Sequence, residues 1–125
     1  MFQVRADSKN NLLEIEFRKQ LTSKEISQCL KRIYNERKCF ESDYNAIIRL
    51  KENLVFVGDA QTKIDLTIFT AKFKRLKKAV IIYPDHCKTS KRTAEKLQHI
   101  YTECNVSCYL TVSEVEAKRL LGILW

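Results

Sequence analysis

Apolar and polar residues alternate along the first part of the chain. The alternation runs over residues 2–6 and again over residues 12–18, and the run between them, 7–11, consists of residues that favour turns (Asp-Ser-Lys-Asn-Asn). Alternation with a period of two is typical of a strand that buries one face. The pattern therefore predicts two strands joined as a β-hairpin.

Farther along, the apolar positions recur every three or four residues, as they do on the buried side of an amphipathic helix. Thr22 and Glu25 have the spacing of a capping box, in which each side chain accepts a hydrogen bond from the other residue's backbone N–H. We therefore expect a helix that begins at Thr22 and ends near Lys38. Its predicted buried residues are Ile26, Cys29, Leu30, Ile33 and Tyr34.

Three further apolar segments predict the remaining strands. Residues 44–50 and 79–83 are nearly continuous apolar runs, which is typical of strands covered on both faces. Pro84 ends the second of them. Residues 108–112 form a shorter strand directly before the last helical pattern.

A helical pattern follows each of these three strands. The predicted N-cap residues, in chain order, are Asp59 or Thr62, Thr89 or Ser90, and Ser113. Their side-chain oxygens suit that position because they can accept from the free N–H groups of a first helical turn. The apolar stripes are predicted at Leu66, Phe69, Phe73 and Leu76, and then at Ala94, Leu97, Tyr101 and Cys104. Glu116 completes a second capping box with Ser113.

The predicted order is β-β-α-β-α-β-α-β-α, which defines a single α/β domain over residues 1–125. Strands that alternate with helices indicate right-handed crossovers, so we expect a mixed, mostly parallel sheet with helices on its faces. The N-terminal hairpin supplies an antiparallel edge. Because an exposed edge invites pairing, a monomer and a homodimer both fit.

Composition narrows the class of protein. Five cysteines, an odd number without a C-x-x-C pair, indicate reduced thiols and a cytoplasmic location. The sequence shows neither an apolar run of about 18 residues, as a membrane span needs, nor a signal segment at its start. Potential metal ligands are not clustered, so we expect no metal and no other cofactor. The net charge of +8 suits an anionic partner, but it does not distinguish nucleic acid from an acidic protein or a membrane surface.

Four segments resemble the STAS domain of bacterial anti-sigma-factor antagonists (SpoIIAA-like), and more closely its STAS/SEC14-like branch. They are residues 20–25 (Gln-Leu-Thr-Ser-Lys-Glu), 44–50, 78–82 and 112–121 (Val-Ser-Glu-Val-Glu-Ala-Lys-Arg-Leu-Leu). The resemblance extends over essentially the whole chain. It implies the SpoIIAA-like fold and a non-enzymatic binding or regulatory role.

The start of the second predicted helix departs from that family. Regulated members carry a phosphorylatable serine after an aspartate there, whereas Ala60 follows Asp59 in this chain. Thr62 offers a hydroxyl nearby, and a phosphate at a helix N-terminus is electrostatically tolerable. An ordinary N-cap is the better explanation of Thr62.

We expect the binding site at the rim near Thr62 and Ser90. Open α/β sheets bind ligands at the carboxyl ends of their strands, and helix N-termini favour anions. The predicted rim residues are Asp59, Thr62, Lys88, Ser90, Lys91 and Arg92. The expected ligand is a protein partner or a small anionic or lipid molecule. A solvated loop with ordinary helix caps accounts for the same residues.

Residues 86–93 support an enzymatic alternative. His86-Cys87 before Arg92 is similar to the loop of cysteine-dependent phosphatases, in which a thiolate attacks phosphorus and an arginine grips two oxygens. Those loops have one more residue than the four found here, and this segment has no glycine. Glycine-free loops make the φ > 0 positions of an anion nest costly. We expect no enzyme, and keep a phosphoester-acting enzyme using Cys87 and Arg92 as the alternative.

A run of basic residues gives a third hypothesis. It consists of Lys72, Lys74, Arg75, Lys77 and Lys78, at the end of the helix predicted after Thr62. Because helices return toward the amino ends of the strands, we expect this run at the opposite end of the sheet from the rim. Cations at a helix C-terminus suit the macrodipole, which explains part of the run. The remainder fits a non-specific nucleic-acid-binding accessory.

Overall fold

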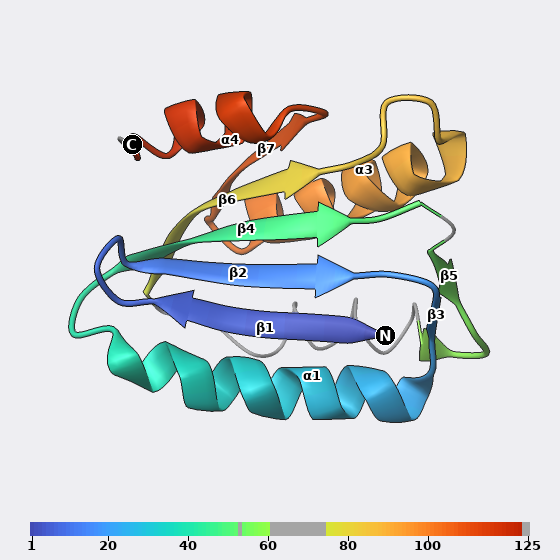
Figure 1. Cartoon of the computed structure of the whole chain (residues 1–125), viewed down its shortest axis with the longest axis horizontal. Coiled ribbons are helices and arrows are strands. Elements are labelled where there is room, and N and C mark those ends of the chain that lie inside the picture. The colour runs from blue at the N-terminus through green and yellow to red at the C-terminus, as the bar shows by residue number, and fades with distance from the viewer. Residues whose placement is uncertain (53, 61–74, 124–125) are drawn as a thin grey trace.

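The computed structural model describes residues 1–52, 54–60 and 75–123, and they form an α/β structure around a five-stranded mixed sheet (Figure 1). The strand order is β1-β2-β4-β6-β7. The strands are β1 (Phe2–Asp7), β2 (Leu12–Phe17), β4 (Tyr44–Leu50), β6 (Leu76–Ile82) and β7 (Ser107–Thr111). Only β1 runs antiparallel to its neighbour, so the predicted hairpin and the mostly parallel sheet are confirmed.

A short second sheet was not predicted from the sequence. Gln20–Leu21 (β3) pairs in parallel with Val55–Phe56 (β5). Strands of two residues are too short to show a period in the apolar pattern. This pair ties the chain after β2 to the chain after β4, beyond the carboxyl ends of both strands.

Helix α1 (Ser23–Glu36) begins where its capping box predicts. The Thr22 hydroxyl accepts from the Glu25 N–H, and the Glu25 carboxylate accepts from the Thr22 N–H. A 3₁₀ turn, η1 (Arg37–Cys39), follows α1. Tyr34 was predicted to be buried and is instead 55% exposed, because it lies about 80° around the helix axis from the buried Ile26.

Helix α3 (Lys88–Glu103) begins earlier than expected. Its N-cap is Cys87, and neither Thr89 nor Ser90 caps it. The Ser90 side chain is turned inward, where it is 2% exposed and lies 3.3 Å from the Cys87 sulfur. The apolar stripe of α3 is buried as predicted at Ala94, Leu97 and Tyr101.

Helix α4 (Glu114–Leu120) has the predicted N-cap, Ser113, whose hydroxyl accepts from the Glu116 N–H. The second half of the expected capping box is missing. The Ser113 N–H donates to the Thr111 hydroxyl instead, and the Glu116 carboxylate binds Arg119.

The start of β6 corrects the prediction for the second helix. Leu76, Lys77 and Lys78 were assigned to that helix and instead belong to β6. The backbone explains this, since the Tyr44 N–H donates to the Arg75 carbonyl at 2.9 Å and thereby begins the pairing of β4 with β6 before residue 79. The other predicted positions of the helix lie outside the described residues, namely Thr62, Leu66, Phe69, Lys72, Phe73 and Lys74.

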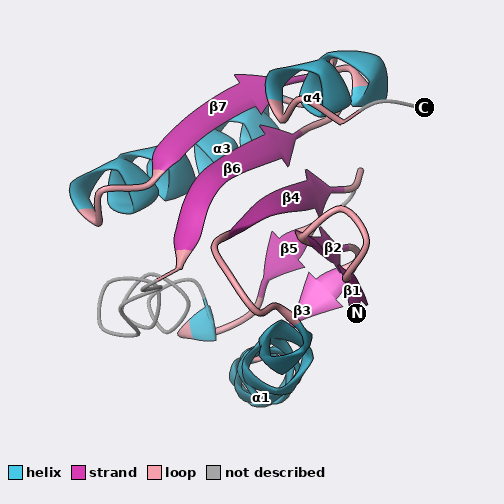
Figure 2. Ribbon diagram, turned by 90° about the vertical axis from the view of Figure 1, so that its left-hand side faces the viewer, coloured by secondary structure: helices cyan, strands magenta, loops and turns pink. Residues whose placement is uncertain are grey.

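The two faces of the sheet are covered unequally (Figure 2). Helices α1 and α3 pack on one face over the larger apolar cluster, which includes Ile15, Ile48 and Ile81. Helix α4 packs on the other face over a smaller cluster centred on Ile47 and Val80. Over β1 and β2 this second face carries charged side chains, so the predicted burial of both faces holds only for part of the sheet.

Both edge strands have an outward-facing carbonyl bound by a neighbouring helix. Arg32 of α1 donates to the Val4 carbonyl of β1 at 3.3 Å, and Gln98 of α3 donates to the Cys108 carbonyl of β7 at 2.9 Å. The hairpin edge is therefore less open to pairing than expected. None of the helices among the described residues combines the length and apolar character that a membrane crossing requires.

Candidate functional site

A hollow of about 580 Å³ lies at the carboxyl ends of all four parallel strands. Each of these four strands contributes to the wall through residues at its carboxyl end or directly after it. The charged lining consists of Arg18 after β2, Lys19, Arg49, Lys51, Glu52 after β4, and Glu114 after β7. This is the place in an open α/β sheet where ligands bind. We call it the carboxyl-end hollow.

Arg18 lines this hollow with a side chain that is 40% exposed. Its Nε–H is buried, and none of the described residues accepts a hydrogen bond from it. Its guanidinium lies 3.7 Å from the Glu16 carboxylate through Nη1, a loose ion pair. A buried donor on a charged group without a partner is costly. Arg18 is therefore suited to an anion that enters the hollow.

Lys19, the next residue, adopts a strained backbone conformation. Its φ of 58° lies in the left-handed region, which costs a residue with a Cβ about 1–2 kcal/mol. The Lys19 carbonyl accepts from the Val55 N–H at 2.8 Å, so the β3–β5 pairing holds it there. Strained residues of this kind concentrate at functional sites, and here the strain turns the chain directly at the edge of the carboxyl-end hollow.

Arg49 lies between two carboxylates on different elements. Its Nε and Nη2 donate to Glu114 at 2.6 and 3.1 Å, and its Nη1 donates to Glu14 at 3.0 Å. The bond from Arg49 lowers the pKa of Glu114. Arg49 thus uses three of its five N–H donors on carboxylates, and it positions α4 beside the carboxyl-end hollow.

Of the predicted rim residues that the structure describes, four lie together at the start of α3, namely Lys88, Ser90, Lys91 and Arg92, and Asp59 belongs to a separate segment. Ser90 is buried against Cys87, and Asp59 is exposed in a turn after β5. The cations Lys88, Lys91 and Arg92 are exposed on the first turns of α3, and none of them lines the carboxyl-end hollow. Thr62 lies outside the described residues. Ala60, which follows Asp59, is fully buried.

The phosphatase-like segment has no phosphate loop. Residues 88–92 are already helical, and the Lys91 N–H donates to the Cys87 carbonyl. Five residues on a helix place Arg92 about 140° around the axis from Cys87, so the two side chains diverge. The bond to Ser90 lowers the pKa of the Cys87 thiol, but the geometry lacks the cradle that the chemistry needs.

His86 is also engaged elsewhere. Its Nε2 lies 2.9 Å from the Glu52 carboxylate, which joins the loop before α3 to the turn after β4. Among the described residues, no three His, Cys, Asp or Glu side chains gather in the way that metal ligands do.

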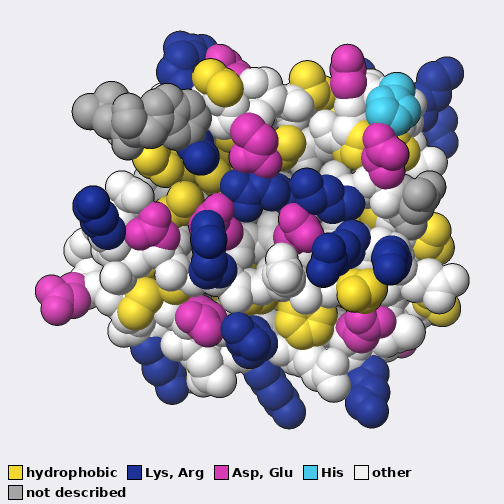
Figure 3. All heavy atoms as spheres, in the orientation of Figure 1, with side chains coloured by type: hydrophobic (Ala, Val, Ile, Leu, Met, Phe, Trp, Pro, Cys, Tyr) yellow, Lys and Arg dark blue, Asp and Glu magenta, His cyan; other side chains and the backbone are white. Residues whose placement is uncertain are grey.

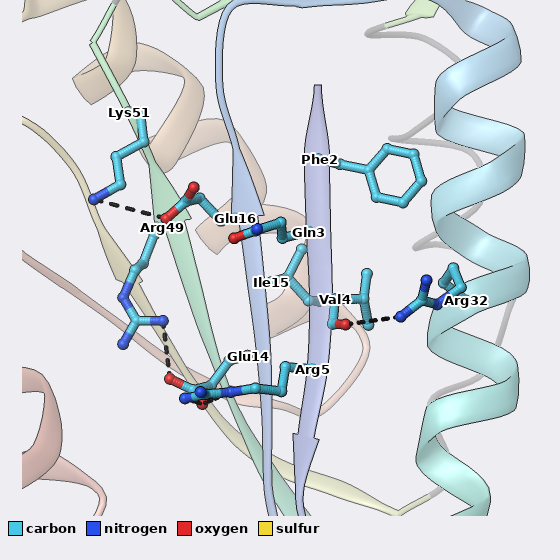
Figure 4. A pocket seen from close by; sticks show the side chains of 10 residues that line it. All are labelled: Phe2, Gln3, Val4, Arg5, Glu14, Ile15, Glu16, Arg32, Arg49 and Lys51. Atoms are coloured by element: carbon cyan, nitrogen blue, oxygen red, sulfur yellow. Dashed lines mark hydrogen bonds and ion pairs between the residues drawn. The ribbon is translucent and has the colours of Figure 1, made fainter.

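A second hollow, of about 680 Å³, lies on the open face of the sheet (Figure 4). Arg5 of β1 binds Glu14 of β2, which also binds Arg49 of β4. Lys51 lies 3.8 Å from Glu16. Basic and acidic side chains accordingly alternate across this face (Figure 3). Because each charge has a partner, this ladder stabilises the open face and offers less to a ligand than the carboxyl-end hollow does.

The predicted basic run is only partly described, and its described residues, Arg75, Lys77 and Lys78, lie at the amino end of the sheet. Arg75 donates to the Phe40 carbonyl at 2.7 Å. Lys77 lies 3.5 Å from Asp43, and Lys78 is exposed. Lys72 and Lys74 are outside the described residues.

Sequence reasoning did not identify the carboxyl-end hollow. Arg18, Lys19 and Lys51 each follow the last residue of a strand by one or two positions, and that placement was the available signal. Comparisons of the chain with protein-family models, with curated proteins and with solved structures found no match.

Proposed function

We propose that the chain is a non-enzymatic, STAS-like binding module that takes a small anionic ligand in the carboxyl-end hollow. The observation that carries the proposal is the buried Nε–H of Arg18, which has no acceptor among the described residues. A phosphate or carboxylate oxygen supplies the acceptor and the charge that this group lacks. The ligand is either a soluble oxyanion or the headgroup of an anionic lipid.

The charge balance of the hollow supports an anion. Four cationic side chains and two carboxylates line it. Both carboxylates are engaged, since Glu52 faces His86 and Glu114 faces Arg49. The volume of about 580 Å³ lies within the range of small-molecule sites. Lys19 has no ion pair among the described residues, and Arg18 and Lys51 are held only by long pairs with Glu16, at 3.7 and 3.8 Å. These three side chains can therefore turn toward a ligand that carries one or two phosphate groups.

The STAS-like part of the proposal rests on the order of the elements and on the two capped helix starts that the resemblance includes. A parallel sheet with binding at one end fits a module that recognises ligands without transforming them. Because Ala60 is buried where regulated relatives carry serine, we do not extend the phosphorylation switch to this chain.

Titration calorimetry with pyrophosphate as the probe tests the proposal. Arg18→Ala should weaken binding roughly 10- to 100-fold, because a charge-assisted hydrogen bond contributes about 1.5–3 kcal/mol. Arg18→Lys should recover part of the loss, since it keeps the charge without the forked donors. The matched control is Lys24→Ala, an exposed cation of α1 that does not line the hollow. It should bind like the unaltered protein.

Flotation with vesicles that contain phosphatidic acid separates the two sources of the anion. Arg18-dependent flotation indicates a lipid headgroup, and Arg18-dependent pyrophosphate binding without flotation indicates a soluble ligand. Binding that Arg18→Ala leaves unchanged, or no binding to either probe, contradicts the proposed function.

A further inference from the structure

The amino end of the sheet carries a second cationic surface, which contains an exposed aromatic ring. Figure 2 looks onto this end of the molecule, where α1 ends and β6 begins. We define the amino-end surface by its side chains, which are Tyr34, Arg37, Lys38, Arg75 and Lys77, together with Lys78, which strand alternation places on the sheet face that α4 covers. It comes from α1, from η1 and from the start of β6, and it lies opposite the carboxyl-end hollow.

Backbone and side-chain contacts hold these three segments side by side. Arg75 donates to the Phe40 carbonyl, directly after η1, while its own carbonyl accepts from the Tyr44 N–H. The positive charges of Arg37 and Arg75 both act on the buried Tyr44 hydroxyl, where they oppose the rise in pKa that burial causes.

The amino-end surface has a clear excess of positive charge. Five cationic side chains lie with two carboxylates, Glu41 and Asp43, on the loop between η1 and β4. Asp43 pairs with Lys77 at 3.5 Å. Lys38 and Lys78 are exposed, and no carboxylate among the described residues pairs with either of them. The macrodipole of α1 favours cations next to its C-terminus, but it does not account for Lys78 on β6.

Tyr34 distinguishes this surface from a solvated patch of lysines. Its ring is 55% exposed, with the Arg37 guanidinium 4.7 Å and the Lys38 ammonium 4.9 Å from the ring centroid. Both cations lie within cation–π distance of the ring, and they attract anions next to it. An exposed aromatic ring beside cations that track a phosphate backbone is the arrangement by which proteins bind single strands without sequence preference.

We propose that the amino-end surface binds single-stranded nucleic acid, with Tyr34 stacking on a base and the surrounding cations contacting phosphates. An acidic protein segment would use the same charges but would gain little from the ring, so the exposed Tyr34 favours the nucleic acid. This interaction does not depend on the anionic ligand of the carboxyl-end hollow, because the two sites lie at opposite ends of the sheet and share no residue.

Fluorescence anisotropy with a labelled oligothymidylate about 16 nucleotides long, near the largest site size of one small domain, tests this proposal. Tyr34→Ala should weaken binding about 5-fold or more, and Tyr34→Phe, which keeps the ring, should change it less than about 2-fold. Tyr34 is exposed, so both variants retain the core. Lys38→Gln with Lys78→Gln should reduce the slope of log K against log salt by roughly 1.4, since two phosphate contacts are lost.

The matched control is Lys24→Gln with Lys91→Gln, which removes two exposed charges at the opposite end of the sheet and should leave the slope unchanged. A polyglutamate peptide is the competing probe. The proposal is overturned if the oligonucleotide does not bind at about 50 mM salt, if Tyr34→Ala binds like the unaltered protein, or if polyglutamate binds as tightly as the oligonucleotide.

Discussion

Arg49 connects three elements through its side chain. It extends from β4 to Glu14 on β2 and to Glu114, the first residue of α4. The Glu114 carboxylate also lies at the N-terminus of a helix, where negative charge is favoured. This pair holds α4 over the second face of the sheet and closes one side of the carboxyl-end hollow.

The Arg49–Glu114 pair should make stability depend on pH in the acid range. Arg49 lowers the pKa of Glu114 below its usual value of 4.5. A carboxyl whose pKa is lower in the folded than in the unfolded chain stabilises the fold at every pH above its unfolded pKa. This contribution is lost as the pH falls through its folded pKa. Urea unfolding at a series of pH values should therefore show Glu114→Gln less stable than the unaltered protein near neutrality, with the difference shrinking below about pH 4.5.

The control is Glu95→Gln, an exposed carboxylate of α3. Its stability should follow that of the unaltered protein at each pH. A difference between Glu114→Gln and the unaltered protein that stays constant from neutral to acid pH contradicts the role given to Arg49.

Some residue roles were predictable from the sequence, and others were not. The Thr22 and Ser113 caps follow from contacts within one helical turn, which the local sequence contains. Ser90 has the right chemistry for a cap, but packing turns it inward. Arg18 could not be identified from the sequence, because its role depends on the burial of its Nε–H. That burial depends on residues far away in the chain.

At the scale of elements, the two edge strands are protected in the same way. Each has one outward carbonyl bound by a side chain from the adjacent helix, Arg32 for β1 and Gln98 for β7. Natural sheets cover or charge their edges to prevent pairing between molecules. Arg32 satisfies a backbone group and also places a positive charge beside the edge.

Removal of the Arg32 side chain should promote self-association. In Arg32→Ala the Val4 carbonyl is exposed to a strand from another molecule, so sedimentation should give a higher average mass than for the unaltered protein at the same concentration. Stability should fall by less than about 1 kcal/mol, because the lost contacts are one partly buried hydrogen bond and one exposed ion pair. Lys31→Ala is the neighbouring control, and equal masses for Arg32→Ala and Lys31→Ala contradict the idea.

Elements long enough to show a periodic apolar pattern were predictable from the sequence, and elements of two or three residues were not. The boundaries of β4 and the start of α1 agree with the prediction. The β3–β5 pair and the early start of β6 depend on which chain segment lies beside them. Neither leaves a periodic pattern of its own.

At the scale of the whole molecule, the strand order explains how the helices are distributed over the two faces of the sheet. The strands from β2 to β7 lie in chain order, so right-handed crossovers place α1 and α3 on the same face. Helix α4 follows the last described strand and packs on the other face. The sequence predicted an α/β sheet, but it did not predict which helices share a face, because that depends on the spatial order of the strands.

This arrangement leaves two cationic surfaces with different chemistry. The carboxyl-end hollow is a concave site with the Arg18 donor, and the amino-end surface is an exposed patch with the Tyr34 ring. We propose that the hollow binds small anions. Amide chemical-shift mapping by NMR during a titration with pyrophosphate tests it directly. Shifts should concentrate at Arg18, Lys19, Lys51 and Tyr83, whereas shifts confined to the amino-end surface, or an unchanged spectrum, would contradict it.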